Sequence, residues 1–149
     1  MKEYSIGEIS RLTGVKVTTV RFYEQRGLIA PPARTSGGQR RYDEAALERL
    51  TFLRHARDLG FGLEDIADLM ALAEAPTEDC APAHEIARKQ LAAVDRRMAI
   101  LGKLRQELAR MAEADDPGQV GACRVIQVLG DHRLCKEDHT SPEATAPNR

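Results

Sequence analysis

Three cysteines and one histidine are the side chains of this sequence best suited to chemistry. Its thiols are Cys80, Cys123 and Cys135, and His132 stands three residues before the last of them. Thiolate and imidazole are ligands of thiophilic divalent metal ions, and a His-x-x-Cys spacing can chelate one ion. Cys80 also opens a predicted long helix, where the helix dipole favours the thiolate form. These residues indicate metal binding or thiol chemistry.

The number of cysteines excludes other site classes. Three is an odd number, which argues against a disulfide framework, and an iron–sulfur cluster needs four clustered cysteines.

The amino terminus has no signal-peptide core, and nothing approaches the roughly 18 consecutive apolar residues of a membrane span. We therefore expect a cytoplasmic protein with reduced thiols and no membrane partner. No nucleophile–base constellation or phosphate loop favours an enzyme.

Charge is unevenly spread along the chain. The formal net charge is −1, yet residues 1–42 hold eight basic side chains against three acidic ones. A basic segment on an acidic body is typical of a surface that meets phosphate. The basic residues of this segment are Lys2, Arg11, Lys16, Arg21, Arg26, Arg34, Arg40 and Arg41.

Helix start and stop signals predict two short helices at the amino terminus. Ser5 followed by Glu8 is a capping box, which marks the start of the first. Either Thr18 or Thr19 can cap the second, which is expected to run through Arg26. Two short helices separated by a tight turn predict a helix-turn-helix.

A wing and two further helices are expected next. Residues 34–42 predict a β-hairpin wing, because their Ser-Gly-Gly centre can take positive φ angles. Asp43 is a good N-cap for a third helix that stops at Gly60, and a fourth is expected over residues 63–74.

The longest element is a helix predicted from about residue 80 to 114. Apolar residues along it step by four and three, the spacing of a coiled-coil seam. These residues are Ala87, Leu91, Val94, Met98 and Leu101, with Arg105 interrupting before Leu108. At 1.5 Å per residue the helix is roughly 50 Å long, which is too long for the compact segment that precedes it to cover. We therefore expect the same helix of a second chain to cover it in a homodimer.

The predicted fold is mainly α, with four parts. Residues 1–75 form a winged helix-turn-helix DNA-binding domain, and residues 76–114 a dimerisation helix. Residues 115–135 form an effector loop and a short apolar helix opened by Cys123. Residues 136–149 are polar and are expected to be a disordered tail.

An ordered series of segments resembles the MerR family of transcriptional regulators over about residues 3 to 114. The segments are Tyr4-Ser5-Ile6-Gly7-Glu8, Thr18-Thr19-Val20-Arg21-Phe22-Tyr23-Glu24, Gly27-Leu28-Ile29, Arg40-Arg41-Tyr42, Phe52-Leu53-Arg54 and Leu59-Gly60-Phe61-Gly62-Leu63-Glu64-Asp65-Ile66. The resemblance implies a winged helix-turn-helix head, an antiparallel coiled-coil dimerisation helix and an effector loop at its far end.

The resemblance also implies a mechanism and DNA contacts. Such dimers bind promoters in which the two elements recognised by RNA polymerase are too far apart along the DNA and out of phase with one another around the double helix, so the polymerase cannot engage both. Effector binding makes them bend and untwist the DNA, so that RNA polymerase engages both elements. Arg21 is expected to approach bases or phosphate, Tyr23 to donate to phosphate, and Phe22 to lie in the core. The expected DNA-binding residues are Thr18, Thr19, Arg21, Tyr23, Arg40, Arg41 and Tyr42.

For metal binding, the resemblance implicates Cys80 and Cys123. In the family's sensors of divalent mercury, zinc, cadmium or lead, a cysteine at the position of Cys80 ligates metal held mainly by the other subunit's loop. Copper(I) sensors typically carry serine there. Cys123 matches the second cysteine of that loop, but the first is missing, because the usual spacing leads back to Asp115 or Asp116.

Two replacements for the missing cysteine are open. Asp116 can supply an oxygen, which gives a harder mixed site better suited to zinc. Alternatively, Cys135 can fold back as a soft ligand, with His132 beside it. The pair can also form a second site, with Asp131 and His139 close by in the sequence.

The sequence therefore predicts a metal-responsive MerR-type regulator. It is expected to bind promoter DNA as a dimer and to activate transcription by distorting the operator when it binds zinc, cadmium, lead or mercury. The alternative is a MerR-type regulator that senses electrophiles or oxidants through cysteine modification.

Overall fold

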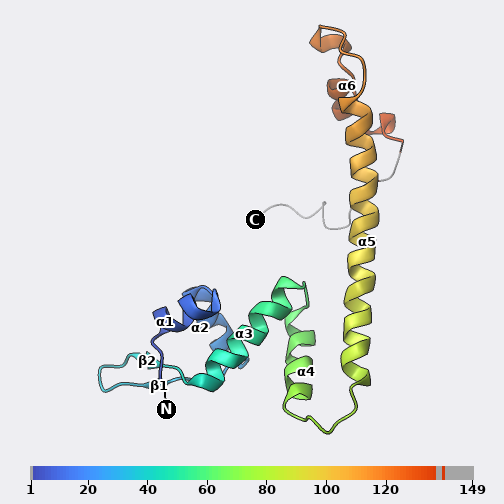
Figure 1. The fold of residues 1–149 in the computed structure, drawn as a ribbon. Coiled ribbons are helices and arrows are strands. Elements are labelled where there is room, and N and C mark those ends of the chain that lie inside the picture. Colours follow the sequence, from blue (N-terminus) through green and yellow to red (C-terminus); the bar gives the residue numbers. More distant parts are fainter. Residues whose placement is uncertain (1, 137–138, 140–149) are drawn as a thin grey trace. The chain divides into compact units, whose positions relative to one another are not determined.

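The computed structural model describes residues 2–136 and residue 139 of the chain (Figure 1). The predicted disordered tail therefore lies almost entirely outside the described residues. In chain order the elements are α1 (Ile6–Thr13), α2 (Val17–Gln25), β1 (Ala33–Arg34), β2 (Arg40–Arg41), α3 (Glu44–Asp58), α4 (Leu63–Ala73), α5 (Ala81–Ala112), η1 (Val120–Ala122), α6 (Arg124–Gly130) and η2 (His132–Leu134). The predicted mainly α fold with a winged helix-turn-helix is confirmed.

Helix α1 begins as predicted, at the capping box of Ser5 and Glu8. The Glu8 amide donates to Ser5 Oγ at 3.3 Å, and the Ser5 amide donates to the Glu8 carboxylate at 2.8 Å. The bond from the Ser5 amide lowers the pKa of Glu8. Gly14 closes the helix in the left-handed conformation, at φ 70°.

Helix α2 begins differently from the prediction. It starts at Val17 with Lys16 as its N-cap and has no side-chain cap, so the predicted capping by Thr18 or Thr19 is wrong. Both threonines lie inside the first turn. Because Val20 is fully buried, we attribute this start to burial of the apolar helix face rather than to a capping side chain.

The wing is a two-stranded antiparallel hairpin. Its register pairs Ala33 with Arg41 and Arg34 with Arg40, and Gly38 turns the loop at φ 78°. An isolated bridge joins β2's neighbour Tyr42 to Tyr4, with N–O distances of 2.8 and 2.9 Å. The backbone just before α1 therefore holds the base of the wing.

A single apolar core joins the first four helices and the wing. Its most deeply buried members come from α1, α2, α3, α4 and the segments between them. They are Ile9, Val20, Ile29, Tyr42, Leu50, Leu53 and Ile66. Burial of these side chains fixes α2 and the wing relative to one another.

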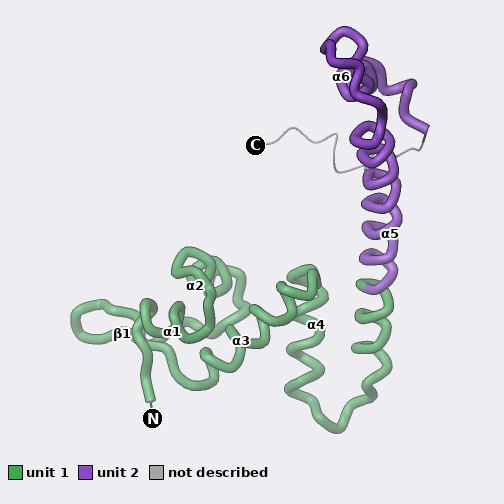
Figure 2. The backbone as a smooth tube through the Cα atoms, turned by 45° about the horizontal axis from the view of Figure 1, so that its top comes forward, with its two compact units in different colours: residues 1–90 green, residues 91–149 purple. Residues whose placement is uncertain are grey.

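The chain divides into two compact units, residues 1–90 and 91–149 (Figure 2). The long helix α5 begins in the first unit and ends in the second. Among the described residues, no helix is long and apolar enough to cross a membrane.

The second unit contains α6 and two short 3₁₀ helices. Helix α6 begins at Arg124, one residue later than predicted, because Cys123 is the extended N-cap residue. Val128 is buried, whereas Leu129 stays exposed. The 3₁₀ turns η1 and η2 on either side of α6 were not predicted, since three-residue turns leave no periodic pattern.

Candidate DNA-binding face and metal-ligand cluster

The exposed face of α2 carries Thr18, Arg21 and Phe22. These residues are three and four positions apart, which places them on one side of the helix. Thr18 and Arg21 are exposed, and Thr19 is half-buried. Within the part of the chain that the structure describes, no side-chain hydrogen bond or ion pair involves Thr18, Thr19 or Arg21, so these groups can meet an external ligand on this side of α2.

The prediction that Phe22 lies in the core is wrong. Its ring is 39% exposed, and the Arg26 guanidinium lies over it, 5.3 Å from the ring centroid. On a nine-residue helix, the buried positions Val20 and Tyr23 face the core, and Phe22 turns outward. The ring and guanidinium together form an apolar and cationic edge beside Arg21.

Helix α2 and the wing meet at a recess of about 350 Å³. Arg21 lines it from α2, Arg40 and Gly38 from the wing, and Ser5 and Ile6 from the start of α1. Three elements thus bring two guanidinium groups and a helix amino terminus to one hollow. This arrangement suits a phosphate group, which arginines and backbone amides both recognise.

Glu24 connects α2 to the wing. Its carboxylate accepts from Arg40 Nε at 3.1 Å and from the Tyr42 hydroxyl at 3.4 Å. No local sequence pattern predicts this bond, because a single glutamate in an amphipathic helix ordinarily points to solvent. Its effect is to hold Arg40 half-buried against α2.

Tyr23 and Tyr42 are core residues in the structure. Their side chains are only 6% and 1% exposed, respectively. Burial, together with the nearby Glu24 charge, raises the pKa of Tyr42. Tyrosine is amphipathic, so the sequence alone does not distinguish a core ring from one that donates to phosphate. Arg41, in contrast, remains half-buried on β2.

Cys80 lies directly before the first residue of α5. It is exposed, and the neighbouring Asp79 carboxylate accepts from the Ala81 amide at 3.0 Å, which stabilises the turn into the helix. A recess of about 320 Å³ in the first unit is lined by Cys80, by apolar residues such as Phe52 and Leu69, and by the acidic residues Glu78 and Asp79. The exposed thiol therefore lines a recess of mixed apolar and acidic character and is open to a ligand.

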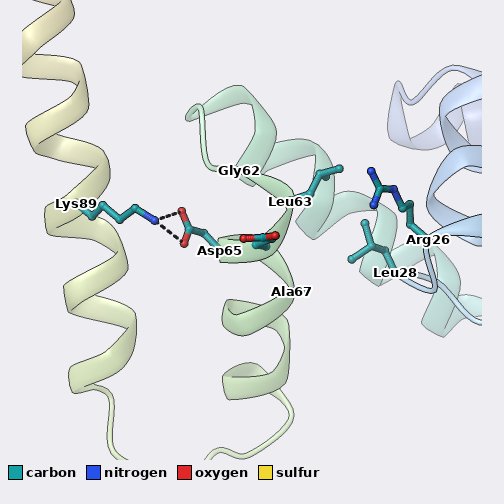
Figure 3. A pocket seen from close by; sticks show the side chains of 8 residues that line it. Arg26, Leu28, Gly62, Leu63, Asp65, Ala67 and Lys89 are labelled. Atoms are coloured by element: carbon teal, nitrogen blue, oxygen red, sulfur yellow. Dashed lines mark hydrogen bonds and ion pairs between the residues drawn. The ribbon is translucent and has the colours of Figure 1, made fainter.

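The first turns of α5 are tied to the head at two points. Lys89 Nζ lies 3.2 Å from an Asp65 carboxylate oxygen in α4, and Gln90 Nε2 donates to the Leu59 carbonyl at 2.9 Å. Figure 3 shows Lys89 and Asp65 on one side of a recess of about 570 Å³ that Arg26 borders on the other. These contacts link the helix that follows Cys80 to α4 and to the end of α3.

Cys123 and Asp116 lie in the second unit but have separate surroundings. Cys123 is half-buried at the start of α6, and its amide donates to the Val120 carbonyl at 3.0 Å. Asp116 is exposed, and its carboxylate accepts from the Gly118 amide at 2.8 Å. The loop carboxylate therefore stabilises its own turn.

His132 and Cys135 come together with a third residue, His139. One ligand atom from each of the three lies within 4.8 Å of the others. The two imidazole centroids are 5.0 Å apart. Within residues 2–136 and 139, neither Cys123 nor Asp116 belongs to this group.

Comparisons with known proteins identify the family. The family model for MerR HTH family regulatory proteins matches residues 4–73, and the model described as MerR, DNA binding, matches residues 47–111. The HTH-type transcriptional regulator ZntR of Escherichia coli strain K12 is 38% identical over 112 residues, which cover 74% of this chain and 79% of ZntR.

A second relative and a solved structure extend the similarity. A probable heavy metal-dependent transcriptional regulator of Haemophilus influenzae is 33% identical over 125 residues, 84% of this chain and 98% of the relative. The crystal structure of the regulator PbrR691 from Ralstonia metallidurans, in complex with lead(II), is 33% identical with a TM-score of 0.70. The match covers 85% of this chain and 98% of PbrR691. The chain belongs to the MerR family of helix-turn-helix transcriptional regulators.

Proposed function

We propose that this protein is a metal-responsive transcriptional regulator that binds promoter DNA as a dimer. Its effector is a thiophilic divalent ion, and Cys80 and Cys123 are the principal ligands. Ion binding makes the dimer distort the operator so that RNA polymerase engages the promoter. The similarity to a heavy metal-dependent regulator and to a lead(II) complex supports the effector class.

DNA binding is assigned to the exposed surface of α2 and the wing. Arg21 and Arg40 border the same recess, and Arg41 follows Arg40 on β2, where it lines a separate recess. Phosphate contacts of this kind position a protein on DNA, and base contacts from Thr18 or Arg21 add sequence preference. Tyr23 and Tyr42 support this surface from the core.

Dimer formation is assigned to the exposed apolar stripe of α5. Leu91, Met98, Leu101 and Leu108 are each at least 60% exposed in the single chain. Burying such side chains stabilises an interface by about 1.5–3 kcal/mol each before ordering costs are counted. The heptad spacing directs them into one seam.

The observation that carries the sensory role is the placement of Cys80. An exposed thiol directly precedes α5. About three turns further along that helix, Lys89 and Gln90 bond to Asp65 and to the Leu59 carbonyl of the first unit. A metal ion that coordinates Cys80 and shifts it therefore also shifts α5, which is bonded to α4 and to the end of α3. Small shifts at such a joint bias the orientation of the DNA-binding heads.

Metal competition tests the proposed effector. Native mass spectrometry of reduced dimer, offered zinc, cadmium, lead, mercury and copper(I) together, is expected to show selective retention of a divalent ion. Cys80→Ser should lose ions relative to the wild type, whereas Ala81→Ser, an exposed neighbour without a thiol, should not. Equal metal content in the wild type and Cys80→Ser would contradict the assignment.

The exposure of Cys80 also favours a second candidate, covalent sensing of electrophiles or oxidants. Under that function the reduced dimer retains no ion at Cys80, and an electrophile adds mass to the thiol. The same mass spectra therefore separate the two candidates.

A further inference from the structure

The geometry points to a metal site at the carboxyl end of the chain, formed by His132, Cys135 and His139 of a single subunit. Its donors are two imidazole nitrogens and one thiolate, and its ligand is a borderline divalent ion of the zinc class. The site is additional to the sensing cysteines proposed above and does not depend on them. Each chain would carry one such ion.

The 3₁₀ turn η2 brings the first two ligands together. In a 3₁₀ helix, residues three apart lie on the same face, one above the other. His132 begins η2, and Cys135, three residues later, donates its amide to the His132 carbonyl at 3.0 Å. The His-x-x-Cys spacing is therefore converted into two side chains on one face of one turn.

Both ends of this turn are fixed. Asp131 caps it, accepting from the Arg133 amide at 3.0 Å and from the Arg133 guanidinium at 2.7 Å. On the other side, the Lys136 amide donates at 2.8 Å to Glu107, a buried carboxylate of α5 that also pairs with Arg110. Because the backbone on both sides of His132 and Cys135 is held, less ordering of these two ligands is needed when an ion binds.

The distances match what zinc requires after a small side-chain adjustment. In a tetrahedral site with Zn–N near 2.0–2.1 Å and Zn–S near 2.3 Å, neighbouring ligand atoms lie about 3.3–3.6 Å apart. The three ligand atoms of this cluster already lie within 4.8 Å of one another. Closing by at most about 1.5 Å is within reach of side-chain rotation, without moving the anchored turn.

The donor set selects the class of ion. Imidazole and thiolate suit zinc and its heavier congeners, whereas magnesium and calcium require oxygen ligands. Three protein ligands leave a fourth tetrahedral position for water or another donor. His132 is exposed and the other two ligands are half-buried, so an ion can enter from solvent.

The test uses the full-length, reduced Cys80→Ser/Cys123→Ser protein, in which Cys135 is the remaining thiol. Cobalt(II), a spectroscopic probe for zinc sites, should bind at one ion per chain and produce a thiolate-to-metal charge-transfer band. Adding Cys135→Ser should abolish the band. His132→Ala and His139→Ala should each weaken cobalt binding by at least about tenfold, since losing even an indirect partner of a metal ligand costs about 10- to 100-fold.

His55→Ala, an exposed histidine of α3, is the matched control and should leave the affinity unchanged. Far-UV circular dichroism should be the same for all variants, because the cluster lies outside the apolar core. Absence of the thiolate band, or equal affinity in His132→Ala, His139→Ala and His55→Ala, would overturn the site. This readout is independent of the sensing site, because both proposed sensing cysteines are already removed.

Discussion

The Glu24 carboxylate in α2 accepts a hydrogen bond from the Arg40 guanidinium in the wing, with Nε 3.1 Å from Oε2. The two side chains are 16% and 26% exposed. Helix α2 and the wing are therefore connected by a partly buried charged pair, one member of which, Arg40, also lines the recess assigned to DNA. The orientation of the wing depends on this pair as well as on the apolar core.

We expect Glu24→Ala to lower the free energy of unfolding by about 1–3 kcal/mol, because it leaves the Arg40 charge and the Tyr42 hydroxyl without their acceptor. The same change should weaken DNA binding by releasing the wing. Urea unfolding and fluorescence anisotropy with labelled DNA measure the two effects. Glu48→Ala, on an exposed part of α3, should change stability by less than about 0.5 kcal/mol; equal losses in both variants would contradict the role of Glu24.

Arg21→Ala and Arg41→Ala should weaken DNA binding while leaving the fold intact. If each side chain neutralises one phosphate, the slope of log K against log salt should fall by about 0.9 for each variant. Titrations at several salt concentrations measure this slope. The control is Arg96→Ala, an exposed arginine of α5 outside the assigned surface; a slope that falls as much in the control would remove the specific assignment.

Gly60→Ala should destabilise the first unit for two separable reasons. Gly60 has φ 86°, which strains any other residue, and an added Cβ would lie 2.5 Å from Gln90 Nε2. We expect a loss of about 1–3 kcal/mol. In a Gln90→Ala background the steric part should vanish, so a double-mutant cycle should show non-additivity.

The matched control for Gly60 is Gly7→Ala in α1. An added Cβ there meets nothing within 4 Å, and the backbone is helical. Alanine should therefore stabilise this helix by about 0.5–1 kcal/mol.

In the double-mutant cycle, additive effects of Gly60→Ala and Gln90→Ala on the free energy of unfolding would show that their side chains do not interact.

Leu101→Asp should convert the dimer to a monomer. Leu101 is 63% exposed in the single chain and belongs to the predicted seam, so a carboxylate there would be buried without a partner at the interface. Sedimentation velocity measures the mass, and circular dichroism shows whether the helices remain. Lys103→Asp, on the opposite face of α5, should stay dimeric; a dimer in both variants would exclude this stripe as the interface.

Local signals in the sequence accounted for much of the head. The Ser5 and Glu8 pair predicted the start of α1, and Gly60 predicted the end of α3, because capping and positive φ angles are local requirements. The 3.6-residue pattern was less decisive on α2. A nine-residue helix gives few repeats, so Phe22 was placed in the core although it faces outward.

Tertiary contacts between distant residues explain the remaining differences. Glu24 and Arg40 are 16 residues apart, and nothing local indicates that they meet. The spacing of His132 and Cys135 predicts a chelating pair, but nothing local indicates that His139 joins it. Likewise, nothing local predicts the contact of the Lys136 amide with Glu107 in α5. The candidate metal ligands can therefore be identified from the sequence, but the fold determines which of them share a site.

Transcription from a defined promoter tests the central claim most directly. A DNA fragment selected by the protein from a random promoter library would be transcribed by RNA polymerase with reduced wild-type or Cys80→Ser protein, with and without zinc, cadmium, lead or mercury. We predict that at least one of these ions raises transcription with the wild type, while Cys80→Ser occupies the DNA equally and gives no increase. Transcription unaffected by every ion, or raised equally by Cys80→Ser, would contradict the account.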